Sequence, residues 1–260
     1  MPEKVKGKVI ALLNPKGGVG KTTSAVNLAG GLSERGRRVL LVDLDDQQYA
    51  TRWADVEVSD NLVEALLKDN PLRPVRSELG FDVVGASDGL STLPREVAGR
   101  LELQARPNDL LSDALEEIGA RDTYDYVLLD CPGDMDMVTV NGMLAADTVV
   151  LPMATASMSL STVRRTFDRV VRLMRAFKRE PRVRVMMGMY QASKRIHQDV
   201  VSEVQSDFAE GERFQTIIPF SVRLEECESH RATIFQHAGS SAPTQAFRDL
   251  TEEVLQWLED

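Results

Sequence analysis

The sequence predicts an α/β fold in which a doubly wound, mostly parallel sheet is flanked by helices. Short apolar runs alternate with longer amphipathic segments, as they do where each strand of a parallel sheet is followed by a crossover helix. The runs expected to form buried strands are 9–13, 39–43, 81–84, 126–130, 148–152 and 183–187. With 260 residues, of which 43% are hydrophobic, the chain is long enough for one large domain with a substantial core.

Composition narrows the class of protein further. The net charge of −9 means that the average surface would repel nucleic acid and anionic membranes. Two cysteines, Cys131 and Cys227, support neither a disulfide framework nor a four-cysteine metal site, and they favour a reducing compartment. His197, His230 and His237 lack the spacing of zinc ligands. The sequence shows no signal-peptide stretch and no apolar run of about 18 residues, so we expect a cytoplasmic protein with no membrane partner.

A glycine-rich segment follows the first apolar run and leads into a helical pattern. Residues 14–23 read Asn-Pro-Lys-Gly-Gly-Val-Gly-Lys-Thr-Thr. A glycine-rich loop between a strand and a helix is the setting of a phosphate-binding loop, whose backbone N–H groups surround a phosphate. In such a loop Lys21 reaches the β- and γ-phosphates and the Thr22 hydroxyl binds Mg²⁺. The segment fits the common pattern G-x-x-x-x-G-K-[ST] only imperfectly, and it carries a second lysine, Lys16, ahead of the glycines.

This departure makes the segment similar to one particular family. Residues 16–23 resemble the deviant Walker A motif of the ParA/MinD family of P-loop ATPases, and the resemblance extends from Lys8 to the end of the chain. It implies hydrolysis of ATP with Mg²⁺ by a single P-loop ATPase domain over residues 1–260. An N-terminal helix-turn-helix extension is not expected, because the motif begins so early. The resemblance also implies a catalytic role for Lys16 at the partner's nucleotide in a homodimer, comparable to an arginine finger.

The next predicted strand, 39–43, ends in an acidic segment. Residues 43–47 read Asp-Leu-Asp-Asp-Gln and would lie at the sheet edge where open α/β folds bind ligands. The segment resembles the family's D-x-D-P-Q, whose second aspartate positions the attacking water. Asp45 is therefore the second expected catalytic residue, with a capping acid at a strand end as the alternative. Asp46 replaces the proline of the pattern, and Tyr49 stands where the family commonly has asparagine.

A second acid ends the predicted strand 126–130. This strand resembles a Walker B segment, in which Asp130 would hold the magnesium shell through water. Cys131 follows directly and is expected to pack instead of react. The residues that the resemblance implies for Mg²⁺, partly through water, are Thr22, Asp45 and Asp130.

Residues 163–184 carry an excess of positive charge. Nine basic and two acidic residues give a local charge of +7, which leaves −16 for the rest of the chain. At helical spacing one face is apolar and most of the arginines lie opposite, the apolar members being Val163, Phe167, Val170, Val171, Met174 and Phe177. A basic face can bind phosphate backbone without reading bases, so Arg172 and Arg175 are candidate DNA contacts. The alternative is a solvated face whose arginines pair with nearby acids.

Residues 216–226 resemble the family's I-P-R-N-V-R-L-s-E-A segment. There a proline-containing loop borders the adenine and an arginine contributes to DNA binding, which implies these roles for Pro219 and Arg223. Phe220 replaces the first arginine of that pattern. The expected nucleotide-binding residues are Lys16, Gly17, Gly18, Val19, Gly20, Lys21, Thr22, Thr23 and Pro219. The expected DNA-binding residues are Arg172, Arg175, Lys194, Arg195 and Arg223.

Residues 243–258 predict a C-terminal helix that packs on the sheet. Its charges are mostly acidic, whereas a membrane-targeting helix of MinD type needs Lys and Arg on its polar face. A partition ATPase of ParA type fits better: an ATP-bound sandwich homodimer would bind DNA non-specifically in the nucleoid. A ParB-like centromere-binding or cargo adaptor protein would stimulate hydrolysis and release it. The alternatives are an ATP-dependent ligase or amidase of the same fold, or a positioning ATPase for a protein cargo.

Overall fold

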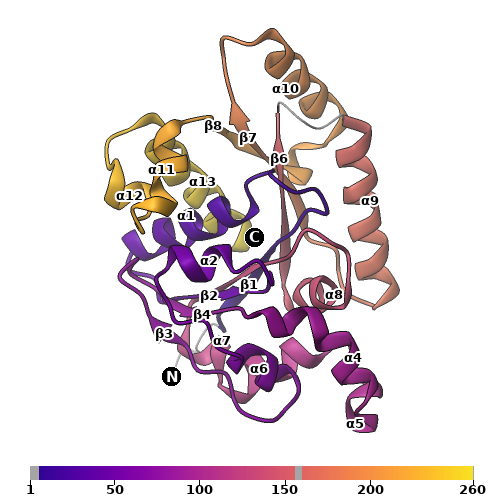
Figure 1. Cartoon of the computed structure of the whole chain (residues 1–260). Coiled ribbons are helices and arrows are strands. Elements are labelled where there is room, and N and C mark those ends of the chain that lie inside the picture. The colour runs from indigo at the N-terminus through magenta and orange to yellow at the C-terminus, as the bar shows by residue number, and fades with distance from the viewer. Residues whose placement is uncertain (1–5, 156–159, 260) are drawn as a thin grey trace, which may run out of the picture.

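The computed structural model describes residues 6–155 and 160–259, which form a central sheet covered by helices (Figure 1). Within those ranges eight strands pair in the order β3-β4-β2-β5-β1-β6-β7-β8. They are β1 (Lys8–Leu12), β2 (Val39–Asp43), β3 (Val75–Arg76), β4 (Asp82–Val84), β5 (Tyr126–Asp130), β6 (Thr148–Ala154), β7 (Val183–Tyr190) and β8 (Arg213–Pro219). The described pairings are parallel except for β3 with β4, which confirms the expected mostly parallel sheet.

Strand β1 lies at the centre of the sheet, between β5 and β6. Its register with β5 runs from Lys8 opposite Tyr126 to Leu12 opposite Asp130. Because the strands are parallel, the segments that follow β1, β2 and β5 leave the sheet at one edge. The glycine-rich loop, Asp43 and Asp130 are thereby brought to the same end of the molecule.

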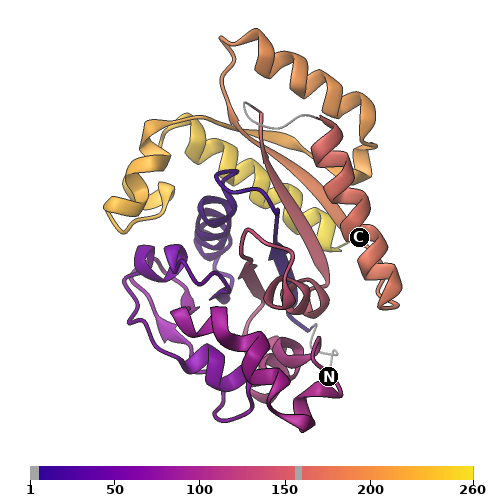
Figure 2. The same ribbon diagram turned by 45° about the vertical axis from the view of Figure 1, so that its right-hand side comes forward.

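Helices cover both faces of the sheet, as Figures 1 and 2 show. Alternate residues of β1 divide between the two cores, Ile10 and Leu12 facing one and Val9 and Ala11 the other. The first core is covered by α1 (Lys21–Glu34), α2 (Tyr49–Trp53), α11 (Val222–Ser229), α12 (Ile234–His237) and α13 (Ala242–Glu259). The second is covered by α3 (Asn61–Leu66), α4 (Leu93–Ala98), α5 (Leu101–Gln104), α6 (Leu110–Glu117), α7 (Ala120–Thr123), α8 (Met137–Ala145), α9 (Leu160–Ala176) and α10 (Arg195–Asp207). The sheet is therefore doubly wound, as predicted.

Several local predictions needed correction. Residues 93–104 form two short helices, because α4 ends at Ala98, with Gly99 as its C-cap, and α5 begins at Leu101. Strand β8 was missed, and Pro219 is its last residue instead of part of a loop. Phe177 is 43% exposed and lies beyond the end of α9, so it does not join the buried face of that helix.

The C-terminal helix α13 packs on the sheet as expected. Phe247, Leu250, Val254 and Leu258 are all buried in the same core as α1. Among the described residues, no helix combines the length and the apolar character that a membrane crossing requires.

Candidate functional site

The glycine-rich loop joins β1 to α1, which begins at Lys21. Gly18 and Gly20 have φ angles of 69° and 84°, a left-handed conformation that glycine adopts without steric cost. Asn14 anchors the start of the loop. Its Nδ2 donates to the Pro152 carbonyl at 2.8 Å, and its Oδ1 accepts the Lys16 N–H at 3.0 Å. The first N–H groups of α1 lack helical acceptors and are available at the loop.

A cavity of about 590 Å³ lies beside this loop. The expected site residues that line it are Gly17, Gly18, Gly20, Lys21, Thr22, Thr23 and Asp45. The sequence motif and the segment after β2 therefore meet in one place. Four expected residues do not line it: Lys16, which is half-buried, Asp130, which is almost completely buried, and Val19 and Pro219, which lie elsewhere around the loop.

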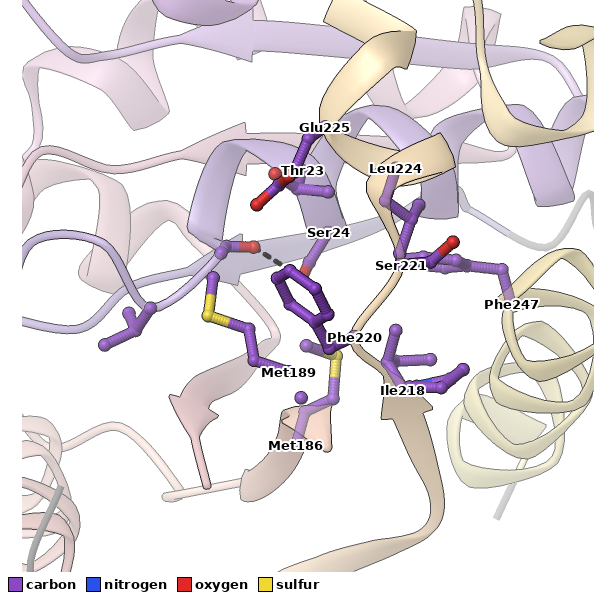
Figure 3. Close-up of a pocket in the computed structure, with 14 residues that line it drawn as sticks. Thr23, Ser24, Met186, Met189, Ile218, Phe220, Ser221, Leu224, Glu225 and Phe247 are labelled. Carbon is purple, nitrogen blue, oxygen red and sulfur yellow. Dashed lines mark hydrogen bonds between the residues drawn. The ribbon is translucent and has the colours of Figure 1, made fainter. Parts of the chain in front are cut away.

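A second cavity, of about 120 Å³, adjoins the larger one at the loop (Figure 3). Val19 and Pro219 line it, together with apolar side chains that include Met186, Ile218, Phe220, Leu224 and Phe247. The two cavities share Gly20, Thr23 and Met189. Together they offer a polar compartment for phosphates and an adjoining apolar compartment for a base.

Two buried carboxylates lie behind the larger cavity. Asp43 accepts the N–H and hydroxyl of Thr51 on Oδ2 at 2.8 and 2.7 Å, and the Asp45 N–H on Oδ1 at 3.1 Å. Burial raises the pKa of Asp43 to about 6 despite these hydrogen bonds. Burial also raises the pKa of Asp130 well above its usual range, and the charge of Asp43 raises it further. Lys21 and Thr22 favour the ionised form of Asp130.

Asp45 sits half-buried at the cavity wall. Its Oδ1 accepts the Gln47 N–H at 3.0 Å, which fixes the turn after β2. Burial raises the pKa of Asp45, while that hydrogen bond and the charge of Lys21 lower it. A carboxylate held at a cavity beside a lysine has the geometry to orient a water molecule.

The donor set suits magnesium. The Thr22 hydroxyl lies close enough to favour ionised Asp130, but neither carboxylate oxygen of Asp130 is in hydrogen-bond geometry with a described residue, although both are buried. A nearby divalent cation would compensate such a charge. Carboxylate and hydroxyl oxygens are the ligands that Mg²⁺ prefers, and it is often held by few protein groups plus phosphates. The described residues contain no cluster of three or more His, Cys, Asp or Glu that could hold a metal by itself. The assignment of Thr22, Asp45 and Asp130 stays a prediction.

The candidate DNA-binding residues fall into two groups. Lys194 and Arg195 begin α10 just after β7, and Arg223 lies in the first turn of α11 just after β8. Since β7 and β8 are paired near their ends, with Tyr190 opposite Pro219, these three residues leave the sheet at the same edge. Helix α9 runs back from that edge. Its last turns therefore carry Arg172 and Arg175 toward the opposite end (Figure 1).

Several arginines of the basic segment, residues 163–184, stabilise the fold through ion pairs or stacking on aromatic rings. Arg164 lies near Asp168 and Glu212, at 3.3 and 3.5 Å, and stacks on Phe167 and Phe208. Arg184 stacks on the rings of Phe214 and Trp257, and Arg182 also lies over Trp257. In contrast, the candidate DNA-binding side chains are exposed and form no ion pair with a described residue; they are Arg172, Arg175, Lys194, Arg195 and Arg223.

The sequence did not single out three further residues at the site. Asn14 anchors the loop, Asp43 is the buried neighbour of Asp130, and Glu225 reaches the smaller cavity. The position of Asp43 at the end of an apolar strand was a usable signal for that residue. The other two depend on contacts with β6 and with the loop, which lie far away in the sequence.

Comparisons with known proteins agree with this geometry. A family model described as an AAA domain matches residues 7–183. The chain is 37% identical to the chromosome-partitioning ATPase Soj of Thermus thermophilus, covering 97% of both chains. It is 34% identical to the chromosome partitioning protein ParA of Caulobacter vibrioides, covering 95% of this chain and 94% of the relative. A solved structure of cobyrinic acid a,c-diamide synthase from Mycobacterium smegmatis, with bound ADP and magnesium, superposes with a TM-score of 0.82. It covers 98% of this chain and 96% of that one at 24% identity, a likeness that shows the fold alone.

Proposed function

The chain belongs to the ParA/MinD family of P-loop ATPases and hydrolyses ATP with Mg²⁺ as its cofactor, and we propose that it works as a DNA-partitioning switch. In this proposal two subunits close face to face around two ATP molecules. The closed homodimer binds DNA without reading its sequence, and hydrolysis returns the subunits to the free state. The protein would thus cycle on and off the nucleoid in the cytoplasm.

One observation carries the proposal. The loop holds two lysines, and of the two described cavities the larger is lined by Lys21. Lys16 lies in the same loop but lines neither cavity. This placement supports a role for Lys16 at the nucleotide of a facing subunit, where an added positive charge would stabilise the transferring phosphoryl group. Hydrolysis would then require the dimer.

The described side chains suit separate tasks at the phosphate end. Lys21, buried at the cavity, would bind the β- and γ-phosphates, and Thr22 and Asp130 would hold Mg²⁺. The metal, when bound, neutralises negative charge on the phosphates. Asp45 would orient the attacking water from the cavity wall. The loop glycines would donate their N–H groups to phosphate oxygens.

The basic residues support the DNA step. Lys194, Arg195 and Arg223 leave the sheet at the edge where the nucleotide cavities open, so closure of the dimer could place two such groups on one surface. Two weak sites joined in one particle bind more tightly than either alone. Arg172 and Arg175 would add a second contact further from the nucleotide. The net charge of −9 does not prevent this, because acids beyond about 8 Å are screened at physiological salt.

A partner bound to the cargo would stimulate hydrolysis. The relatives named above are chromosome-partitioning proteins, so the partner class we propose is a ParB-like centromere-binding or cargo adaptor protein. Its effect would be to release DNA by ending the ATP-bound state.

A subunit-mixing experiment tests the proposal. Lys16→Ala and Asp45→Ala should each bind ATP but hydrolyse it poorly. When the two variants are mixed, a Lys16→Ala subunit retains Asp45 and receives Lys16 from its partner, so ATPase activity should reappear. Lys21→Ala serves as the control, because it should abolish ATP binding and rescue nothing. If the mixture stays inactive although light scattering shows an ATP-dependent dimer, Lys16 does not act in trans and the proposal is wrong.

A further inference from the structure

Helix α11 presents one acidic side chain to the smaller cavity. Glu225 is the one ionisable residue among the described residues that line it; the rest are apolar, glycine, serine or threonine. Its carboxylate forms no hydrogen bond or ion pair with a described residue. The next residue, Glu226, differs in both respects: it lies 3.2 Å from His237 Nε2 and lines neither cavity. Glu225 is therefore an unoccupied acceptor at the edge of a mostly apolar compartment.

The orientation of a bound nucleotide follows from the loop. Phosphates belong at the larger cavity with Lys21 and Thr22, and the base belongs in the apolar one. The sugar joins the two, so it must pass the residues that both cavities share, Thr23 among them. In the view of Figure 3, Glu225 and Thr23 point to the same end of the smaller cavity, whereas Ile218 and Phe247 lie at the other.

The chemistry at that end fits a ribose. A ribose presents two neighbouring hydroxyl donors, and a carboxylate presents two acceptor oxygens and no donor. An acidic side chain that accepts from ribose hydroxyls is an established device in other nucleotide-binding folds. The apolar residues that line the cavity, such as Phe220 and Leu224, suit the faces of the base.

We propose that the Glu225 carboxylate accepts hydrogen bonds from the 2′- and 3′-hydroxyls of the bound ATP and selects ribonucleotides over 2′-deoxyribonucleotides. The inference rests on the proposed function, since it assumes that ATP occupies the two cavities. It adds a specificity-determining residue that contacts neither the phosphates nor the reacting atoms.

Nucleotide binding to four proteins tests this inference. Affinities for ATP, dATP and GTP are measured by calorimetry with the wild type, Glu225→Ala, Glu225→Gln and the control Glu226→Ala. Wild type and Glu226→Ala should bind ATP about tenfold more tightly than dATP, as expected for loss of one hydrogen bond to a charged group. The Glu225→Ala variant should bind ATP and dATP with about equal affinity. The Glu225→Gln variant should keep part of the preference for ATP over dATP, because an amide still accepts one hydrogen bond.

Three results would overturn the inference. One is a wild type that binds ATP and dATP equally. Another is a Glu225→Ala variant that keeps the full preference for ATP over dATP. The third is a variant whose ratio of ATP to GTP changes while its ratio of ATP to dATP does not, since Glu225 would then read the base. In each case ATP still binds, so the proposed function survives. A wild type that binds no ATP would reject both.

Discussion

Asp43 and Asp130 lie directly opposite each other on the neighbouring strands β2 and β5, and burial raises the pKa of both carboxyl groups. Two neighbouring carboxylates that are shielded from water make each other's ionised state unfavourable unless a cation lies nearby. A carboxyl group whose pKa is higher in the folded than in the unfolded protein stabilises the fold at low pH. This stabilisation is lost as the pH rises through the folded-state pKa. The nucleotide-free protein should therefore lose stability as the pH rises from about 4 through about 6, where Asp43 titrates.

Asp130→Asn should stabilise the nucleotide-free protein at pH 8, by about 1–3 kcal/mol. The substitution removes a buried charge whose oxygens have no hydrogen-bond partner among the described residues. It should also flatten the decline of stability with pH. Urea unfolding of both proteins at pH 5 and pH 8 measures the effect. A variant that is less stable than the wild type at pH 8 would show that Asp130 is satisfied in the apo protein.

Asp45→Ala should separate ATP binding from hydrolysis. ATP affinity should change little, because the loop and Lys21 are untouched, whereas turnover should fall roughly 10²–10⁴-fold. Single-turnover hydrolysis beside equilibrium binding provides the measurement. Wild-type turnover in this variant would mean that another residue orients the water.

The loop and the sheet could be predicted because their signals are local. A glycine-rich segment between an apolar run and a helical pattern has few interpretations other than a phosphate-binding loop. The motif at residues 16–23 can be recognised without reference to any residue far away in the sequence. Glu225 could not be predicted in this way, since it lies some 200 residues from the loop that it faces.

The separation of the basic residues was equally hidden in the sequence. Arg172, Arg175 and Arg223 were each expected to contact DNA, but α9 runs away from the edge where Arg223 lies and carries the first two with it. The candidates were chosen from their charge along the helix, without regard to where each turn of the helix lies relative to the strand ends.

His197 should matter for stability, although it was expected to have no ligand role. Its Nδ1 accepts the Gln191 N–H at 3.2 Å and so has no proton of its own to donate to Thr155 Oγ1, which lies 2.9 Å away. His197→Ala would remove the acceptor of the Gln191 N–H and leave a space in the core, at a cost of about 2–4 kcal/mol. Thermal unfolding measures this cost. His230→Ala, at an exposed position, should change stability by less than about 0.5 kcal/mol, and an equal loss in both variants would contradict the account.

Charge reversal should distinguish the two basic groups. Arg223→Glu, and separately Arg172→Glu with Arg175→Glu, should weaken DNA binding and lower its salt dependence while ATP affinity stays unchanged. Arg76→Glu is the control, because Arg76 lies on β3, the strand farthest from β8 in the sheet. This substitution should leave DNA binding unchanged. Filter binding at several salt concentrations provides the comparison. If only the Arg223 variant loses affinity, the α9 residues do not contact DNA.

The central claim is that ATP controls DNA binding, and one titration tests it most directly. DNA of random sequence is titrated with the wild-type protein in ADP, in ATP and in a non-hydrolysable ATP analogue, each with Mg²⁺. The account predicts weak binding with ADP, and binding with the analogue that is tight, indifferent to sequence and steeply reduced by salt. Absence of DNA affinity with the analogue at low salt, or equal affinity with ADP, would contradict it.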